Sequence, residues 1–471
     1  MLKKIIIAVL IAAVLAASIF GVIAYRFHNA LKPDITEENL AKGATLNDAA
    51  RALKGSAPFS AWKAQAGDAA EIDFGKEVTF NTVTLTESGD NVRMFRFYKL
   101  VNGAWELFYE QDRIAGYRMC TFEPTTTSKL KIEVAECDAP VKLSGLGVYH
   151  QAKSTNQIKV SQYLTMGENE IVALRDSGDA GFSGYYDVVT DVIIIGAVHM
   201  DAETNIFFPD GEQAFADNLQ ALRDIIGERN VRIWSTVRFD QPETENNSSL
   251  DATRDFINNR VADMTKSIAD FVEKYDLYGI DYDWEYPQTS AQWKAYSTLV
   301  TQSAAQFKVS VALPPWGVHF SRDAVKCIEH VNVMAYDLFD DRGDHANIQW
   351  GTVASAKNLL SAGFEKSQIL LGIPTYGRTV DGSAYAWPVI KGNEEILGKF
   401  NSIVRDNTFT DDNGETHTYD AYVQSYAEAR DKTAYAEETG LGGVMIFRAK
   451  CDAPYTYEYS IHRGIQEAIE T

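Results

Sequence analysis

The pattern of hydrophobic and polar positions divides the chain into three parts. Residues 5–25 carry no charge, and a helix of that length, rising about 1.5 Å per residue, crosses a hydrocarbon core of about 30 Å. Residues 44–150 alternate apolar and polar side chains over short runs between turn residues, which is typical of strands. From residue 155 to 471, short apolar runs alternate with amphipathic stretches, which indicates buried parallel strands joined by helices.

The first part, residues 1–26, is predicted to be a transmembrane signal anchor. Lys3 and Lys4 precede the apolar run and Arg26 follows it, so the positive-inside rule places everything after Arg26 outside the cytoplasm. The expected location is the cell membrane, with a single pass. A cleaved signal peptide, which would give a secreted protein, is the alternative, because small residues inside the run offer a cleavage point. The polar residues 27–43 are assigned to a linker.

Residues 44–150 are predicted to form an antiparallel β-sandwich of the jelly-roll type. About a hundred residues of short strands at this spacing are typical of that architecture. The predicted strands include EIDFG, VTFNTVTLTE, RMFRFYKL, WELFYEQD, MCTFEP and KLKIEVAE. Trp62 and Trp105 fall at strand positions, where aromatic side chains usually pack into the core.

Residues 155–471 are predicted to form an α/β structure, a (β/α)8 TIM barrel. An eighth run near residues 158–164 joins the seven runs DVIIIGAVHM, NVRIWSTVRF, LYGIDYDWE, FKVSVALPP, HVNVMAYD, ILLGIPTYG and GGVMIFR. Helices are expected over 213–227, 250–275 and 358–362. A doubly wound open sheet is the alternative, but it would have a glycine-rich phosphate loop after its first strand, and none is present. In a barrel, catalytic groups lie at the carboxyl ends of the strands.

Three carboxylates close one of these runs. Strand side chains alternate between two faces, so Asp281, Asp283 and Glu285 in GIDYDWEYP point to one side. If the intervening residues pack on the outer helices, the acids line the barrel interior, where unpaired carboxylates are costly and repel each other. We therefore expect proton sharing and acid/base chemistry. A calcium loop is the alternative, but its sixth position would be Tyr286 instead of glycine.

The composition of the chain argues against nucleic-acid binding and against a zinc site. The chain has 44 basic and 65 acidic side chains and a formal net charge of −21, which excludes a nucleic-acid binder that relies on phosphate neutralisation. It has four cysteines and no zinc-type spacing. No metal and no cofactor are expected, and the oligomeric state is not readable from the sequence.

Four motifs resemble glycoside hydrolase family 18, the chitinase family. YGIDYDWEYP is similar to its DxxDxDxE signature, VNVMAYD to its MxYD strand end, LLGIPTYGR to its seventh strand and GLGGVMIF to its eighth. The resemblance implies a barrel that hydrolyses β-1,4 bonds in N-acetylglucosamine-containing glycans with retention, the acetamide of the substrate serving as nucleophile. Such enzymes are exceptions to the two-carboxylate scheme. The implied partner is an N-acetylglucosamine polymer or oligosaccharide.

The resemblance also implies roles for individual residues. Glu285 would protonate the leaving oxygen and then activate water, Asp283 would hold the acetamide N–H, and Asp281 would tune Asp283. Tyr336 would donate its hydroxyl to the acetamide oxygen; a core tyrosine is the alternative. The predicted substrate-binding residues are Asp337, Tyr376, Arg378, Phe447 and Trp316. Arg378 could equally be a structural ion-pair residue, and Trp350 and Trp387 could be further sugar platforms or surface packing.

The chain departs from the family pattern in three places. Tyr278 replaces the first acid of the signature, at the amino end of the strand, so we expect a structural change and retained activity. The stretch 235–238 has Ser-Thr-Val-Arg instead of Ser-x-Gly-Gly, and Phe447 replaces a tryptophan. These departures leave open an endo-β-N-acetylglucosaminidase, a peptidoglycan hydrolase, and a chitin-binding lectin with weak or lost catalysis.

The strand order of residues 44–150 resembles the discoidin-like domains, the galactose-binding-like domains of coagulation-factor type C, that accompany bacterial glycosidases. The resemblance implies a role in sugar binding or as a spacer, with Trp62 and Trp105 as conceivable stacking residues.

Overall fold

The computed structural model describes residues 31, 33, 35–55, 61–152, 157–239, 249–340, 343–379, 384–385, 402–410 and 414–470. The predicted anchor, residues 1–26, lies outside these ranges, as does Trp387. Among the helices of the described ranges, none is both long enough and apolar enough to span a membrane.

The first folded part is an antiparallel sheet of seven strands, which we call the N-terminal β-domain (residues 40–149). The strand order is β2-β7-β3-β6-β4-β5, and β1 pairs with β3. The 3-10 helix η1 and the short helix α2 pack against these strands. The bounds are η1 Leu40–Lys42, β1 Thr45–Leu46, α2 Asp48–Leu53, β2 Trp62–Ala64, β3 Ala69–Glu87, β4 Val92–Val101, β5 Ala104–Gln111, β6 Tyr117–Cys137 and β7 Val141–Tyr149.

Two of these strands are longer than predicted. EIDFG and VTFNTVTLTE form the single strand β3, and MCTFEP and KLKIEVAE form the single strand β6. Their pairing is interrupted between Asp73 and Val78 and between Phe80 and Thr82, and such irregularities let a strand bend without ending. Trp62 is buried in the core of the domain, and Trp105 is half-buried beneath the Lys131 ammonium.

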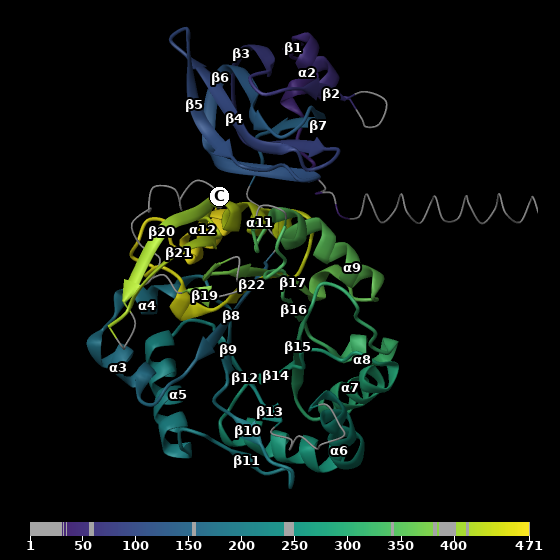
Figure 1. Cartoon of the computed structure of the whole chain (residues 1–471), viewed down its shortest axis with the longest axis vertical. Coiled ribbons are helices and arrows are strands. Elements are labelled where there is room, and N and C mark those ends of the chain that lie inside the picture. Colours follow the sequence, from purple (N-terminus) through teal and green to yellow (C-terminus); the bar gives the residue numbers. More distant parts are fainter. Residues whose placement is uncertain are drawn as a thin grey trace, which may run out of the picture.

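The second folded part is a closed barrel of eight parallel strands, in the order β12-β14-β15-β16-β17-β22-β8-β9, which confirms the predicted barrel. Figure 1 shows the β-domain seated on one side of it. The bounds are β8 Lys159–Thr165, β9 Asp191–Ile195, β12 Arg232–Thr236, β14 Gly279–Asp283, β15 Lys308–Leu313, β16 Val331–Val333, β17 Ile369–Pro374 and β22 Gly443–Phe447.

Helices surround the barrel (Figure 1) and bury its outer face. The α-helices are α3 Glu170–Ser177, α4 Ala180–Ser183, α5 Glu212–Ile226, α6 Ser249–Lys274, α7 Ser290–Ser303, α8 Arg322–Cys327, α9 Ser355–Ser361, α11 Tyr426–Glu438 and α12 Ile461–Glu470. Shorter turns are η2 Gly184–Asp187, η3 Trp350–Ala354, η4 Lys366–Gln368 and η5 Ala449–Cys451. α5, α6 and α9 cover the three stretches that the sequence predicted as helices.

Two small sheets extend the loops at the barrel rim. One has the strands β10 His199–Met200, β11 Ile206–Phe207 and β13 Arg238–Phe239. The other has β18 Gly377–Arg378, β19 Ala384–Tyr385, β20 Ser402–Thr410 and β21 Thr416–Val423. The second sheet is formed by an insertion for which the sequence offered no interpretable motif.

Alternation along β14 separates its side chains as expected. Ile280 and Tyr282 pack in the core between strands and helices, whereas Asp281 points inward. The interior is filled by side chains from other strands, including Tyr163, Ile193, Trp234, Ala312, Leu370 and Met445. The barrel is therefore a packed core, and a site can form only where this packing ends.

Candidate active site

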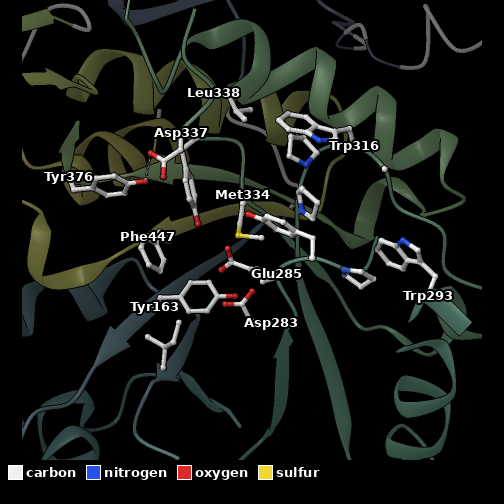
Figure 2. Close-up of a pocket in the computed structure, with 18 residues that line it drawn as sticks. Tyr163, Asp283, Glu285, Trp293, Trp316, Met334, Asp337, Leu338, Tyr376 and Phe447 are labelled. Atoms are coloured by element: carbon white, nitrogen blue, oxygen red, sulfur yellow. Dashed lines mark hydrogen bonds between the residues drawn. The ribbon is translucent and has the colours of Figure 1, made fainter. Parts of the chain in front are cut away.

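A cavity of about 460 Å³ opens where the carboxyl ends of the barrel strands meet. Figure 2 shows the side chains that converge on it from several different strands and loops. Seven of the predicted site residues line it: Asp283, Glu285, Tyr336, Asp337, Tyr376, Phe447 and Trp316. Asp281 lies beneath the cavity and Arg378 lies behind Asp337.

Asp281 is completely buried and fully hydrogen-bonded. Its carboxyl group accepts hydrogen bonds from Tyr163 Oη at 2.7 Å, Ser310 Oγ at 2.6 Å and Asn332 Nδ2 at 3.0 Å. Burial raises the pKa of Asp281, and these three hydrogen bonds oppose that rise. A carboxyl group held in this way is a fixed part of the barrel interior, from which it acts on its neighbour Asp283 by charge.

Asp283 and Glu285 lie next to each other at the cavity, as Figure 2 shows. Solvent reaches the Asp283 side chain through the cavity, but protein encloses its carboxyl group on the other sides. This burial raises the pKa of Asp283 well above its ordinary value, and the carboxyl groups of Glu285 and Asp281 raise it further. The raised pKa favours the protonated form of Asp283, which shares a hydrogen bond with Glu285. The pair can exchange that proton, which acid/base catalysis requires.

Tyr336 supplies a hydroxyl group above this pair. Its ring is buried, and burial raises the pKa of the phenol well above its ordinary value, so the hydroxyl keeps its proton and can donate it in a hydrogen bond. Gly372 of β17 makes room for the ring, because a Cβ there would lie 3.0 Å from Tyr336 Cε1 and 2.2 Å from Val333 O.

Phe447 at the end of β22 forms an aromatic floor with three tyrosines. Its ring is stacked on Tyr336 with centroids 5.7 Å apart, and it contacts the edges of Tyr163 and Tyr376. An apolar ring of this kind can carry the face of a sugar. Phe447 is half-buried and lines the cavity, so part of its surface is free for such contact.

Asp337 joins the loop after β16 to the β17 end of the site. It adopts a left-handed backbone conformation with φ of 59°. Its carboxylate accepts a hydrogen bond from Tyr376 Oη at 2.8 Å, lies 3.1 Å from His345 Nδ1 and pairs with Arg378 Nη2 at 3.0 Å. Burial opposes its ionisation, but the hydrogen bonds from His345 and Tyr376 and the electrostatic attraction of His345 and Arg378 together lower the pKa of Asp337. Asp337 is therefore an anion.

Trp316 stands at the cavity rim with 48% of its surface exposed. Its ring meets Trp350 edge to face, with centroids 5.5 Å apart. This contact holds the indole at the rim, and about half of its surface stays exposed toward the cavity.

Residues 185–452, more than half of the chain, match the sequence family described as glycosyl hydrolases family 18. The chain belongs to this family. The barrel is therefore a glycoside hydrolase domain.

Named relatives of this family 18 chain are chitinases. Endochitinase 1 of Metarhizium robertsii is 23% identical over 239 residues, which are 41% of this chain and 56% of that protein. Chitinase A1 of Niallia circulans is 23% identical over 259 residues, which are 41% of this chain and 37% of that protein. The chain thus spans about half or less of the length of these curated relatives.

Two solved structures share the barrel of this family 18 chain. The GH18 chitinase ChiB of Flavobacterium johnsoniae aligns over 68% of this chain and 94% of its own, with a TM-score of 0.51 and 19% identity. A chitinase of Bacteroides thetaiotaomicron aligns over 67% and 97%, with a TM-score of 0.52 and 18% identity. At these identities the likeness shows the fold. The family match begins at residue 185, so the discoidin-like resemblance of the β-domain stays a prediction.

Sequence reasoning missed several residues of the family 18 site. Tyr163, Ser310 and Asn332 hold Asp281, and His345 holds Asp337. Asn332 could have been found, because alternation in VNVMAYD puts it on the same side as Met334 and Tyr336. His345 had no comparable signal, since it meets Asp337 only after the loop turns back.

The third barrel strand of this family 18 chain borders a second cavity of about 360 Å³. Val237 and Arg238, which stand at the two glycine positions of the family pattern, line it together with Thr236, Asp283 and Glu285. The bulk that the sequence predicted near the sugar site therefore lies beside both acids.

Tyr278 stands where the family 18 signature has its first acid. It contacts residues at the amino ends of two barrel strands, β12 and β16. Its hydroxyl lies 3.2 Å from Glu329 Oε2 and accepts from Arg232 Nη1 at 3.3 Å. The Arg232 guanidinium also lies over its ring at 4.7 Å from the centroid. Glu329 thus provides a carboxylate near this position from another strand end.

We expect Tyr278→Phe to lower the free energy of unfolding by about 1 kcal/mol, because one partly buried hydrogen-bonding hydroxyl is lost, and to leave kcat unchanged. Urea unfolding and initial-rate assays measure the two effects. Tyr275→Phe is the matched control, since its hydroxyl donates to the exposed Glu212 and contributes less. A fall in kcat for Tyr278→Phe would contradict a purely structural role.

Proposed function

We propose that the protein hydrolyses β-1,4 bonds in N-acetylglucosamine-containing glycans of the chitin type, by a retaining mechanism in which the substrate assists. The observation that carries this proposal is the pair Asp283 and Glu285, which lines one cavity together with Tyr336 above the buried Asp281. The names of the chitinase relatives support the same substrate class.

Substrate binding would redistribute the single proton of the acid pair. An N-acetyl group between Asp283 and Tyr336 offers its N–H to Asp283 and its carbonyl oxygen to the Tyr336 hydroxyl. A carboxylate accepts the N–H better than a carboxylic acid does, so the proton of Asp283 passes to Glu285 across their hydrogen bond. Substrate binding thus leaves Glu285 protonated, so that it can act as the general acid.

The first chemical step breaks the glycosidic bond. Glu285 gives its proton to the leaving oxygen, the acetamide oxygen forms a bond to the anomeric carbon, and the bond from that carbon to the leaving oxygen breaks. The resulting oxazolinium carries positive charge, which the Asp283 carboxylate balances at close range. Asp281 contributes to the negative potential from below.

The second step releases the sugar. Glu285, now a carboxylate, takes a proton from water as the water oxygen bonds to the anomeric carbon and the oxazolinium ring opens. Two inversions at that carbon give net retention. Phe447 and Tyr376 hold the sugar ring in place during both steps. Phe447 makes apolar contact with the sugar, and Tyr376 presents the polar edge of its ring to it.

Mass-spectrometric analysis of products tests the proposal. The purified protein is incubated with chito-oligosaccharides, with a free N-glycan and with peptidoglycan fragments. Cleavage of the chito-oligosaccharides supports the chitinase-type activity. Selective cleavage of the N-glycan would support an endo-β-N-acetylglucosaminidase instead, and binding without cleavage of any substrate would support a lectin.

Trp316→Ala is expected to raise KM for chito-oligosaccharides by about 2- to 10-fold, because an exposed aromatic face that stacks on a sugar is lost. The effect on kcat should be smaller, since Trp316 lies at the rim. Trp105→Ala on the β-domain is the matched control for soluble substrates. Equal KM values for Trp316→Ala and the unchanged protein would remove Trp316 from the substrate-binding residues.

We also propose that residues 1–26 anchor the protein in the cell membrane with the barrel outside the cytoplasm. The charge pattern around the apolar run supports this orientation. Fractionation of cells and protease treatment of intact cells would test it, and release of the barrel into the medium would favour signal cleavage.

A further inference from the structure

The β-domain meets the barrel through buried charged groups. Arg118 of β6 donates to Asp431 Oδ2 of α11 at 2.6 Å, and Tyr109 Oη of β5 donates to the same oxygen at 2.9 Å. The Arg118 and Asp431 side chains are 0% and 1% exposed. Figure 1 shows the β-domain resting on the side of the barrel that carries α11. Such a contact is a fixed attachment, because separating these charges would leave each one unpaired.

A second arginine of the β-domain reaches toward the active site. Arg113, between β5 and β6, is 2% exposed. Within the β-domain it binds Asp90 through Nε at 3.1 Å and Nη2 at 2.9 Å. Across the interface it pairs with Asp340 and lies 3.9 Å from Asp344 Oδ2, both in the loop after β16. One guanidinium thus joins a fixed acid of the β-domain to two acids of a barrel loop.

That loop begins at the site itself. Asp340 and Asp344 close a turn, with Asp344 N donating to Asp340 Oδ1 at 2.9 Å. The next residue, His345, contacts Asp337 at 3.1 Å, and its backbone oxygen accepts from Leu338 N at 3.2 Å. Asp337 directly follows Tyr336. The contacts therefore run without a gap from Arg113 through the turn to the two residues that face the acetamide.

We propose that Arg113 of the β-domain is a positioning residue for hydrolysis, which holds the loop after β16 so that Tyr336 and Asp337 keep their places at the cavity. This inference rests on the proposed function. It makes the β-domain part of the catalytic unit. The requirement is geometric: a planar guanidinium presents several N–H groups in fixed directions, and it can hold Asp90, Asp340 and Asp344 together, which a lysine ammonium cannot.

The charged groups around Arg113 explain why its loss would displace the loop after β16. Asp344 is buried, and burial together with the nearby Glu428 raises its pKa to about 6. Burial raises the pKa of Asp112 well above its ordinary value, and Glu428 and Asp344 raise it further. Asp340 also raises the pKa of Asp344. Lys432 of α11 is a second buried cation beside the loop, where it donates to Ala346 O. Removing Arg113 leaves several carboxyl groups in one place, which repel each other and push the turn away.

The test compares Arg113→Gln and Arg113→Lys with matched variants of Arg430. Arg430 spans the same interface, donating to Thr121 O at 2.7 Å and pairing with Glu467, but it does not touch the loop. We expect Arg113→Gln to lower kcat by about 10- to 100-fold, the cost of a displacement of about 1 Å in a reacting group, with a smaller change in KM. The kcat of Arg113→Lys should lie between the values of Arg113→Gln and the wild-type protein. The Arg430 variants should have the wild-type kcat.

Hydrogen exchange gives a second readout that needs no substrate. Amide exchange over residues 334–348 should quicken in the Arg113 variants and stay unchanged in the Arg430 variants. If Arg113→Gln does not fold, Arg113→Lys carries the comparison, because it retains the charge.

Wild-type kcat and wild-type loop exchange in a folded Arg113 variant would overturn the inference. Full rescue of both by lysine would also overturn it, since charge alone would then suffice. If the unchanged protein cleaves none of the glycans, the proposed function fails, and loop exchange by itself decides the role of Arg113.

Discussion

Glu285→Gln is expected to lower kcat on chito-oligosaccharides by about 10²- to 10⁴-fold or more, because the amide can neither give a proton to the leaving oxygen nor take one from water. Glutamine has nearly the same shape as glutamate and still accepts a hydrogen bond from Asp283. The cavity should therefore keep its form, and substrate should still bind.

Product formation by mass spectrometry and binding by calorimetry measure the two quantities separately. Glu228→Gln is the matched control, since Glu228 is an exposed carboxylate that follows α5 and does not line the cavity. Turnover of Glu285→Gln at the unchanged rate would exclude Glu285 as the acid/base. Loss of binding together with turnover would point to a damaged cavity instead.

Asp283→Asn is expected to lower kcat by about 10²- to 10³-fold, the range for removing one preorganised electrostatic contact to a developing charge. Asparagine fills the same space, but it cannot pass a proton to Glu285 and cannot balance a positively charged oxazolinium. Because burial and the neighbouring acids Glu285 and Asp281 raise the pKa of wild-type Asp283 and so favour its neutral form, the substitution changes little charge before substrate binds. The effect should therefore fall on kcat and leave the unfolding free energy nearly unchanged.

Steady-state kinetics and urea unfolding of Asp283→Asn test both halves of this expectation. Asp210→Asn, at an exposed position before α5, is the control. An unchanged kcat would exclude Asp283 from the charge-balancing role. A large loss of stability would show that Asp283 is ionised in the resting protein, contrary to the direction of its pKa.

The barrel and its acids could be predicted from the sequence because the information is local. Each barrel strand is a short apolar run, and alternation puts Asp281 and Ile280 on opposite faces of the strand, which the structure identifies as the inner and the outer face. The sequence did not show that the predicted strands join to form β3 and β6. Turn residues such as Gly75 indicate a strand end, but here they lie in an irregularity of the strand, and pairing with the neighbouring strand resumes after it.

The contacts that hold the site together also escaped prediction. Arg113 and Asp340 lie far apart in the sequence and in different domains, and neither belongs to a motif. The same holds for Asp337 and His345, which meet through the folding of a loop. Charged residues of this kind resemble ordinary surface residues in a sequence, since only tertiary structure decides which of them become buried.

The buried pairs between the β-domain and the barrel also bear on the order of events during synthesis. Arg113 and Arg118 are synthesised long before their barrel partners, which are Asp340 for Arg113 and Asp431 for Arg118. N-terminal domains generally fold first during translation. A β-domain that folds first therefore holds Arg118 without its barrel partner until α11 has been made, whereas Arg113 already pairs with Asp90 of the same domain. Docking of α11 against β6 then gives Arg118 its partner.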